Sequence, residues 1–163
     1  MWSTLPGVPA VYNSRARSAG GPMTRIAHCC CRSLRAETLG EPAVVSACHC
    51  TECQRRTGAP FGVSCYFPRE QVRTVGVSTV YARNGQEGRS VRIHFCPTCG
   101  TSVYWEADAR PGMIGVALGA FADPSFPKPS RSAWEQTRHP WVGFEHELDH
   151  FEQQPPTAAA GPH

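Results

Sequence analysis

The chain has 163 residues, of which 18% are charged, and its formal net charge is +3 at pH 7. This length fits a single domain, and so small a charge does not by itself predict a nucleic-acid partner. No apolar run approaches the roughly 20 residues that a membrane-spanning helix needs, so we expect a soluble, cytoplasmic protein.

Composition divides the chain into three parts. Residues 1–24 contain no acidic side chain and are rich in Gly, Pro, Ser and Arg, which predicts a disordered extension without the apolar core of a secretion signal. Met23 is an alternative start of the chain. Residues 25–152 carry the cysteines and nearly all the aromatic residues and form the predicted domain, and residues 153–163 are predicted to be a disordered tail.

The domain is predicted to be mainly β, with short helical turns. Thr51 and Gln54 match a capping box, which predicts a helical turn that begins there and stops at Gly58. Runs rich in β-branched or aromatic residues, most of them bounded by Gly, Pro or Asn, predict strands. In chain order these runs are Ala43–Ala47, Phe61–Phe67, Ser78–Ala82, Ser90–Phe95, Thr101–Trp105 and Met113–Leu118.

Seven of the nine cysteines fall into three short groups, a C-x-C pair, a C-x-C-x-x-C group and a C-x-x-C pair. Closely spaced cysteines on tight turns are typical of zinc sites. A disulfide framework is disfavoured because the cysteine count is odd and cysteines one residue apart are poor disulfide partners. The three groups are Cys29 and Cys31; Cys48, Cys50 and Cys53; and Cys96 and Cys99.

The natural partition of these sulfurs predicts two zinc ions. The two outer pairs together supply four thiolates, which close a structural site and would tie the first strand to the hairpin that begins after Phe95. The central group supplies three thiolates, so its zinc keeps a position open to water or substrate. This difference between a closed and an open site is the basis of the functional hypothesis.

The central group has further chemistry around it. Cys53 is predicted to lie in the first helical turn, with Cys50 just ahead of it, where free N–H groups and the helix dipole favour thiolate. Arg55 and Arg56 follow, either to supply positive charge beside the three thiolates, to bind a substrate carboxylate, or as a pair of solvated arginines. His49 lies between two predicted ligands, where it orients a thiolate, contacts a bound thiol, or is an exposed spacer.

Longer motifs around the cysteines carry a resemblance to a known family. They are CHCTEC at 48–53, TGAPF at 57–61, FCPTCG at 95–100 and GAFADP at 119–124, followed by Trp134 and Trp141. Over about residues 25–152 the chain resembles the glutathione-dependent formaldehyde-activating family, which also includes the domain of centromere protein V.

The resemblance implies a β-tent fold of antiparallel sheets and an enzyme, a carbon–sulfur lyase or synthase. Its substrates would be glutathione and formaldehyde, joined into S-hydroxymethylglutathione. The alternatives are a glutathione-binding zinc protein without catalysis, and an interaction module in which zinc only holds the fold. The resemblance further implies a structural zinc on Cys29, Cys31, Cys96 and Cys99 and a catalytic zinc on Cys48, Cys50 and Cys53.

The first cysteine pair departs from the family pattern, which places Gly immediately before and after C-x-C. Here His28 and Arg32 flank the pair, so the turn lacks the glycine that adopts positive φ without steric cost. His28 or the spacer Cys30 is therefore an alternative ligand. Alternate residues of an extended segment point to the same side, which favours Cys29 and Cys31.

Two other features are predicted to be unrelated to the site. Cys65 stands apart from the three groups and is expected to pack in the core as a small hydrophobe. Residues 146–150 fit the H-E-x-x-H pattern of zinc proteases. That segment is short and shows no third ligand. It also aligns with the terminal strand of the family that the chain resembles, where a period of two would separate the two histidines, so we interpret the motif as a coincidence.

Replacing both His146 and His150 with Ala is expected to leave the zinc content of the protein unchanged, because neither side chain is assigned as a ligand. Elemental analysis of the purified double variant checks this. Loss of a full zinc equivalent would reverse the interpretation.

Overall fold

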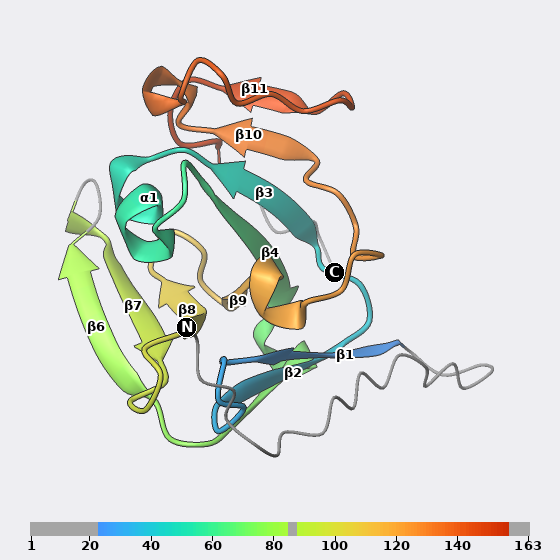
Figure 1. Cartoon of the computed structure of the whole chain (residues 1–163), viewed down its shortest axis with the longest axis vertical. Coiled ribbons are helices and arrows are strands. Elements are labelled where there is room, and N and C mark those ends of the chain that lie inside the picture. The colour runs from blue at the N-terminus through green and yellow to red at the C-terminus, as the bar shows by residue number, and fades with distance from the viewer. Residues whose placement is uncertain (1–22, 85–87, 157–163) are drawn as a thin grey trace, which may run out of the picture.

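The computed structural model describes residues 23–84 and 88–156 (Figure 1). The predicted extension 1–24 and the predicted tail 153–163 lie mostly outside the described residues. The one α-helix among the described residues is α1, Thr51–Thr57, and short 3-10 turns are η1, Arg69–Gln71, η3, Leu118–Phe121, and η4, Glu135–Thr137. The strands are β1, Thr24–His28, β2, Arg35–Leu39, β3, Val44–Cys48, β4, Gly62–Pro68, β5, Val72–Val75, β6, Thr79–Asn84, β7, Ser90–Phe95, β8, Ser102–Ala107, β9, Met113–Ala117, β10, Arg131–Ala133, and β11, Asp149–Phe151.

The expected fold class is confirmed: the structure is mainly β and its strands pair mostly antiparallel. Three strands form a small sheet in the order β1-β2-β5, and eight form a larger sheet in the order β11-β10-β3-β4-β9-β8-β7-β6. The exception is β10, which pairs parallel with both β3 and β11. In Figure 1 the small sheet lies across one end of the larger sheet, and α1 lies beside β3 and β4.

All six predicted strands are present. β7 has the predicted ends, and the other five agree to within two residues at each end. Strands β2, β5 and β10 were not predicted, because they are short and carry charged or small residues instead of an apolar run. The first strand, expected beside Cys29, and the strand expected over residues 146–150 are present as β1 and β11, although no apolar run marks either of them. Such strands form where a neighbouring strand offers hydrogen-bond partners, which sequence pattern does not reveal.

One buried cluster joins the two sheets. Ala27 and Ala36 come from the small sheet, whereas Phe67, Val103 and Val116 come from the larger one, and all five are fully buried. This burial explains why short strands form a stable unit, since removal of apolar surface from water is the dominant favourable term in folding.

Cys65 is also fully buried in this cluster, which confirms its predicted place in the core. Burial raises the pKa of its thiol to about 12, so Cys65 stays protonated.

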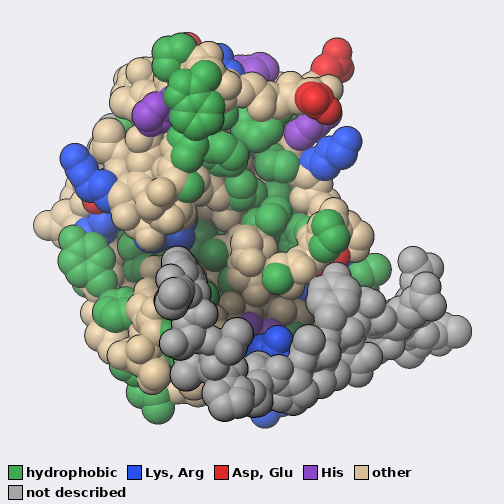
Figure 2. All heavy atoms as spheres, viewed as in Figure 1, with side chains coloured by type: hydrophobic (Ala, Val, Ile, Leu, Met, Phe, Trp, Pro, Cys, Tyr) green, Lys and Arg blue, Asp and Glu red, His purple; other side chains and the backbone are tan. Residues whose placement is uncertain are grey.

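The surface carries both hydrophobic and charged side chains. On the face shown in Figure 2, hydrophobic side chains run over the middle and most charged side chains lie toward the edges. No helix among the described residues is long and apolar enough to cross a membrane.

Gly76→Ala is expected to lower the free energy of unfolding by more than about 2 kcal/mol. Gly76 has φ +100°, and an added Cβ would collide with the Ser33 carbonyl oxygen in the turn between β1 and β2. Gly112→Ala is the control, because Gly112 has φ +73° but open space around it, so only the backbone penalty of about 1 kcal/mol applies. Denaturant unfolding measures both, and equal losses would contradict the steric argument.

Candidate metal and substrate site

The two outer cysteine pairs come together as predicted. Cys29 and Cys31 lie in the turn between β1 and β2, Cys96 and Cys99 lie in the turn between β7 and β8, and the four sulfurs all lie within 4.8 Å of one another. The Sγ of Cys31 is 3.6 Å from that of Cys29 and 3.5 Å from that of Cys96. Tetrahedral zinc with Zn–S bonds of about 2.3 Å separates its sulfurs by about 3.8 Å. The donor set therefore fits zinc.

The two turns share one backbone design. In both, the N–H of the first cysteine donates to the carbonyl five residues later, from Cys29 to Leu34 at 2.9 Å and from Cys96 to Thr101 at 3.0 Å. The residue after the second cysteine is left-handed in both turns, with φ 66° at Arg32 and 74° at Gly100. Arg32 therefore adopts the conformation that glycine would reach without strain.

The alternative ligands do not join this group. Cys30 is exposed, and its backbone N–H donates to the Thr101 hydroxyl at 3.2 Å. His28 lies at the end of β1, and neither it nor Cys30 belongs to a metal-binding group among the described residues. Although this turn lacks the family's glycines, Cys29 and Cys31 still group with Cys96 and Cys99.

Hydroxyl groups favour the thiolate form at two of these sulfurs. The Ser33 hydroxyl, followed by the backbone N–H of Cys99, lowers the pKa of Cys96 to about 7. The Thr101 hydroxyl and backbone N–H lower the pKa of Cys99 to about 5. Thiolate is the form that binds metals, so the surroundings prepare these side chains for zinc.

The central group also forms, at the start of α1. Cys48 ends β3, Cys50 precedes the helix and Cys53 lies in its first turn, with the three sulfurs within 4.8 Å of one another. The predicted N-cap, Thr51, is wrong: Cys50 is the N-cap, and its sulfur accepts the backbone N–H of Cys53 at 3.4 Å. The sulfur of Cys50 thus has the capping role that the capping box assigned to Thr51, one residue earlier in the chain.

The other features of the predicted helix have mixed outcomes. Gln54 does not close a capping box; its side-chain amide donates to the carbonyls of His49 at 2.7 Å and Thr137 at 3.0 Å. The helix stops at Gly58 as predicted, and Gly58 is the left-handed C-cap with φ 65°.

The three central thiols share their protons unequally. Hydrogen bonds from the thiols of Cys48 and Cys53, and then from backbone N–H groups at the helix start, lower the pKa of Cys50. The hydrogen bonds that the Cys48 thiol donates to Cys50 and Cys53 raise the pKa of Cys48. Cys50 therefore carries the first negative charge, and a cation that replaces the shared protons would satisfy all three sulfurs.

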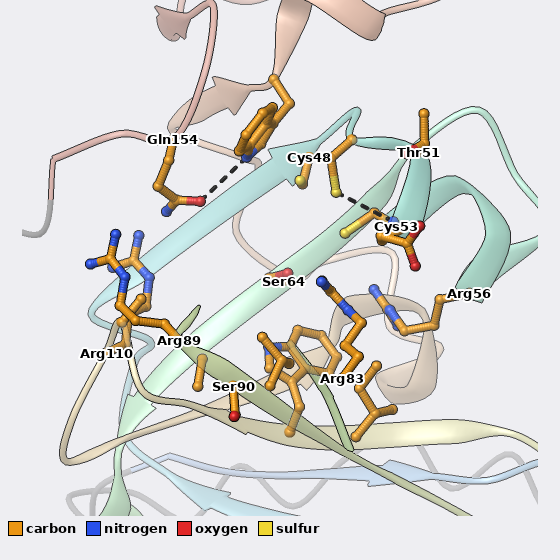
Figure 3. A pocket seen from close by; sticks show the side chains of 18 of the residues that line it. Cys48, Thr51, Cys53, Arg56, Ser64, Arg83, Arg89, Ser90, Arg110 and Gln154 are labelled. Carbon is orange, nitrogen blue, oxygen red and sulfur yellow. Dashed lines mark hydrogen bonds between the residues drawn. The ribbon is translucent and has the colours of Figure 1, made fainter. Parts of the chain in front are cut away.

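These three cysteines open into a cavity of about 330 Å³ (Figure 3). Its lining is strongly cationic, because it contains four arginines and one acidic residue, Glu52. Aromatic and polar side chains complete the wall, including Tyr66, Trp105 and Trp134. The arginines are Arg56, Arg83, Arg89 and Arg110.

The two predicted arginines have different positions. Arg56 lines the cavity, and its guanidinium lies 4.5 Å from the centroid of the Trp105 ring, a cation–π contact. Arg55 lies outside the cavity, with 73% of its side chain exposed, and pairs with Glu52 at 2.6 Å. Neighbouring helix residues point about 100° apart, so they do not share a site. The proposed carboxylate contact is therefore kept for Arg56 only.

His49 is neither an exposed spacer nor part of the cavity lining. It is fully buried, its Nε2 lies 3.1 Å from the Ser132 hydroxyl, and its ring packs against Phe61 and Phe144. Burial lowers the pKa of His49. Its contacts fix the chain between Cys48 and Cys50, so of the three predicted roles the structure favours orientation of the neighbouring cysteines.

The H-E-x-x-H segment is not helical. The ring of His146 donates from Nε2 to the carbonyl of Pro129 at 2.9 Å, and His150 in β11 pairs with Glu135 at 2.8 Å. The two histidines are engaged separately, which agrees with our interpretation of the motif as a coincidence.

Comparison with known proteins supports the family resemblance. A family model described as "Glutathione-dependent formaldehyde-activating enzyme" matches residues 24–137. The chain belongs to this family. Family membership supports a glutathione-related, formaldehyde-activating function. A similar solved structure is the crystal structure of a Rhodobacter sphaeroides protein, with 22% identity over 61% of this chain and 91% of that chain and a TM-score of 0.49.

Sequence reasoning missed most of the cavity wall. Ser64 and Tyr66 line the cavity, whereas Cys65 and Phe67 on the same strand lie in the core. The period-two alternation of β4 contained this signal, because the face opposite the buried one must cover something else. Arg110 had no local signal, since it lies in an irregular segment after β8.

Arg32→Gly is expected to raise the free energy of unfolding by about 1 kcal/mol, because glycine reaches φ 66° without the Cβ clash of an L-residue. Denaturant unfolding of the zinc-loaded protein measures the change. Arg73→Gly is the control: Arg73 lies in β5 with an exposed side chain, where glycine only weakens a strand. Equal destabilisation by both substitutions would contradict the argument.

Proposed function

We propose that this protein binds glutathione in the cationic cavity and catalyses addition of its thiol to formaldehyde, giving S-hydroxymethylglutathione. The observation that carries the proposal is the position of the central cysteines, whose three sulfurs open into that cavity. Glutathione has two carboxylates, and guanidinium groups bind carboxylates through paired hydrogen bonds. Membership of the family supports the same substrates.

We assign different roles to the two cysteine groups. The four outer thiolates would hold a structural zinc, because four protein ligands leave no position for a substrate. Cys48, Cys50 and Cys53 would hold a catalytic zinc with one position open. When bound, this zinc supplies Lewis acidity, which lowers the pKa of a thiol placed beside it.

The proposed reaction needs no redox partner. A carbon–sulfur bond forms between the glutathione sulfur and the formaldehyde carbon, the carbonyl π bond breaks, and the thiol proton ends on the former carbonyl oxygen. Arg56 lines the cavity beside the central cysteines and carries a positive charge. The same positive charge favours a thiolate substrate at that end of the cavity.

Catalytic amounts of the zinc-loaded protein are expected to speed exchange between glutathione and S-hydroxymethylglutathione beyond the uncatalysed rate. Exchange NMR at equilibrium measures both rates in one sample. Cys50→Ser is expected to abolish the acceleration and to lower zinc from about two to about one per folded chain, since it removes a ligand of the open site only. Elemental analysis and circular dichroism accompany the assay.

Cys30→Ser is the matched control, because Cys30 is exposed and belongs to neither cysteine group. It is expected to keep both the zinc content and the acceleration. An exchange rate equal to that of the protein-free sample would refute catalysis and leave a glutathione-binding protein or an interaction module. Loss of both zinc ions from a folded Cys50→Ser variant would refute the separate sites.

A further inference from the structure

Two arginines of the cavity each stack on one of two aromatic rings that contact each other. The guanidinium of Arg110 lies 4.5 Å from the centroid of the Tyr66 ring, and that of Arg56 lies 4.5 Å from the centroid of the Trp105 ring. The two rings meet edge to face, with centroids 6.4 Å apart and an interplanar angle of 84°. Trp105 also donates from Nε1 to the Tyr66 hydroxyl at 3.4 Å. This pair of rings thus has one guanidinium stacked on each ring.

Glycines make room for this arrangement. A Cβ on Gly115 would collide with the indole of Trp105, and a Cβ on Gly62 would lie 2.9 Å from Nη2 of Arg56. Trp105 itself is 5% exposed. The Trp105 ring is therefore held in place by packing, which reduces the entropy that a ligand must remove on binding.

The acids nearest to Arg110 in sequence are engaged elsewhere. Asp108 accepts from Nη1 of Arg92 and from the backbone N–H of Ser90, both at 2.9 Å. Glu106 pairs with Arg69 at 2.8 Å and with Arg92 at 3.6 Å. Within residues 23–84 and 88–156, no carboxylate forms an ion pair with Arg110. Its charge is therefore available to an anionic ligand.

Arg110 also lies away from the cysteines. Its backbone N–H donates to the Ala107 carbonyl at 2.9 Å, which places it in the turn after β8, whereas Cys53 lies in the first turn of α1. In Figure 3 the Arg110 side chain lies at the opposite end of the view from Cys53 and Arg56. One cavity thus has a cation beside the thiols and a second cation at a distance from them.

We propose that Arg110 binds the substrate carboxylate that lies farther from the sulfur and so selects thiols with two carboxylates. The inference rests on the proposed function, because it places the substrate sulfur at Cys48, Cys50 and Cys53. A peptide thiol with a carboxylate on each side of its sulfur reaches both Arg56 and Arg110. A small thiol without these groups reaches neither, so Arg110 is a specificity-determining residue of the cavity.

The test is calorimetric titration of the zinc-loaded full chain with S-methylglutathione, which keeps both carboxylates but has no thiol to react. Arg110→Gln is expected to weaken binding about tenfold, the loss typical of a charge-assisted hydrogen bond. Arg110→Lys, which keeps the charge without the planar donor pair, is expected to lose less. Arg73→Gln is the matched control for loss of one positive charge, because Arg73 lies on the small sheet, where it pairs with Glu37. The affinity of Arg73→Gln for S-methylglutathione should equal that of the wild type.

The dimethyl ester of S-methylglutathione separates carboxylate recognition from misfolding. It should bind the wild type and Arg110→Gln equally weakly, because no carboxylate remains for Arg110 to bind. Equal affinity of the wild type and Arg110→Gln for S-methylglutathione, or no binding by the wild type, would overturn the inference. If Arg110→Gln binds more weakly but the wild type gives no acceleration in the exchange assay, the subsite is supported and the proposed catalysis is refuted.

Discussion

The central constraint on this structure is the grouping of four cysteine thiols from two turns, one in each sheet. Cys29 and Cys31 lie between strands of the small sheet, whereas Cys96 and Cys99 lie between strands of the larger one. The strands of the small sheet have four or five residues each, too few to bury much apolar surface by themselves. A metal held by all four sulfurs would therefore fix one sheet against the other.

The candidate site depends on the different surroundings of the two faces of the larger sheet. One face of β4 points into the core through Cys65 and Phe67, and the other lines the cavity through Ser64 and Tyr66. The neighbouring β3 delivers Cys48 to the edge of that cavity, and α1 begins directly beyond it. The packed core thus provides a rigid support for three sulfurs that a flexible loop would hold less well.

Charge is distributed so that the cavity stays cationic although the whole chain has a net charge of only +3. Glu106 and Asp108, on and just after β8, are paired with Arg69 and Arg92 away from the central cysteines. Arg110 follows them in sequence but remains without an acidic partner among the described residues. Ion pairs at the surface contribute little to stability, so their consequence here is that Glu106 and Asp108 are engaged with arginines other than Arg110.

The sequence alone determined the features that depend on short spacing. The three short cysteine groups, the strands with apolar runs and the helix end at Gly58 were all predictable, because residues a few positions apart meet within one turn or strand. Tertiary structure decided the rest. It placed Cys50 at the helix cap, buried His49, separated Arg55 from Arg56 and brought Tyr66, Trp105 and Arg110 to one wall. These contacts depend on which distant strands pair, and local sequence does not specify that pairing.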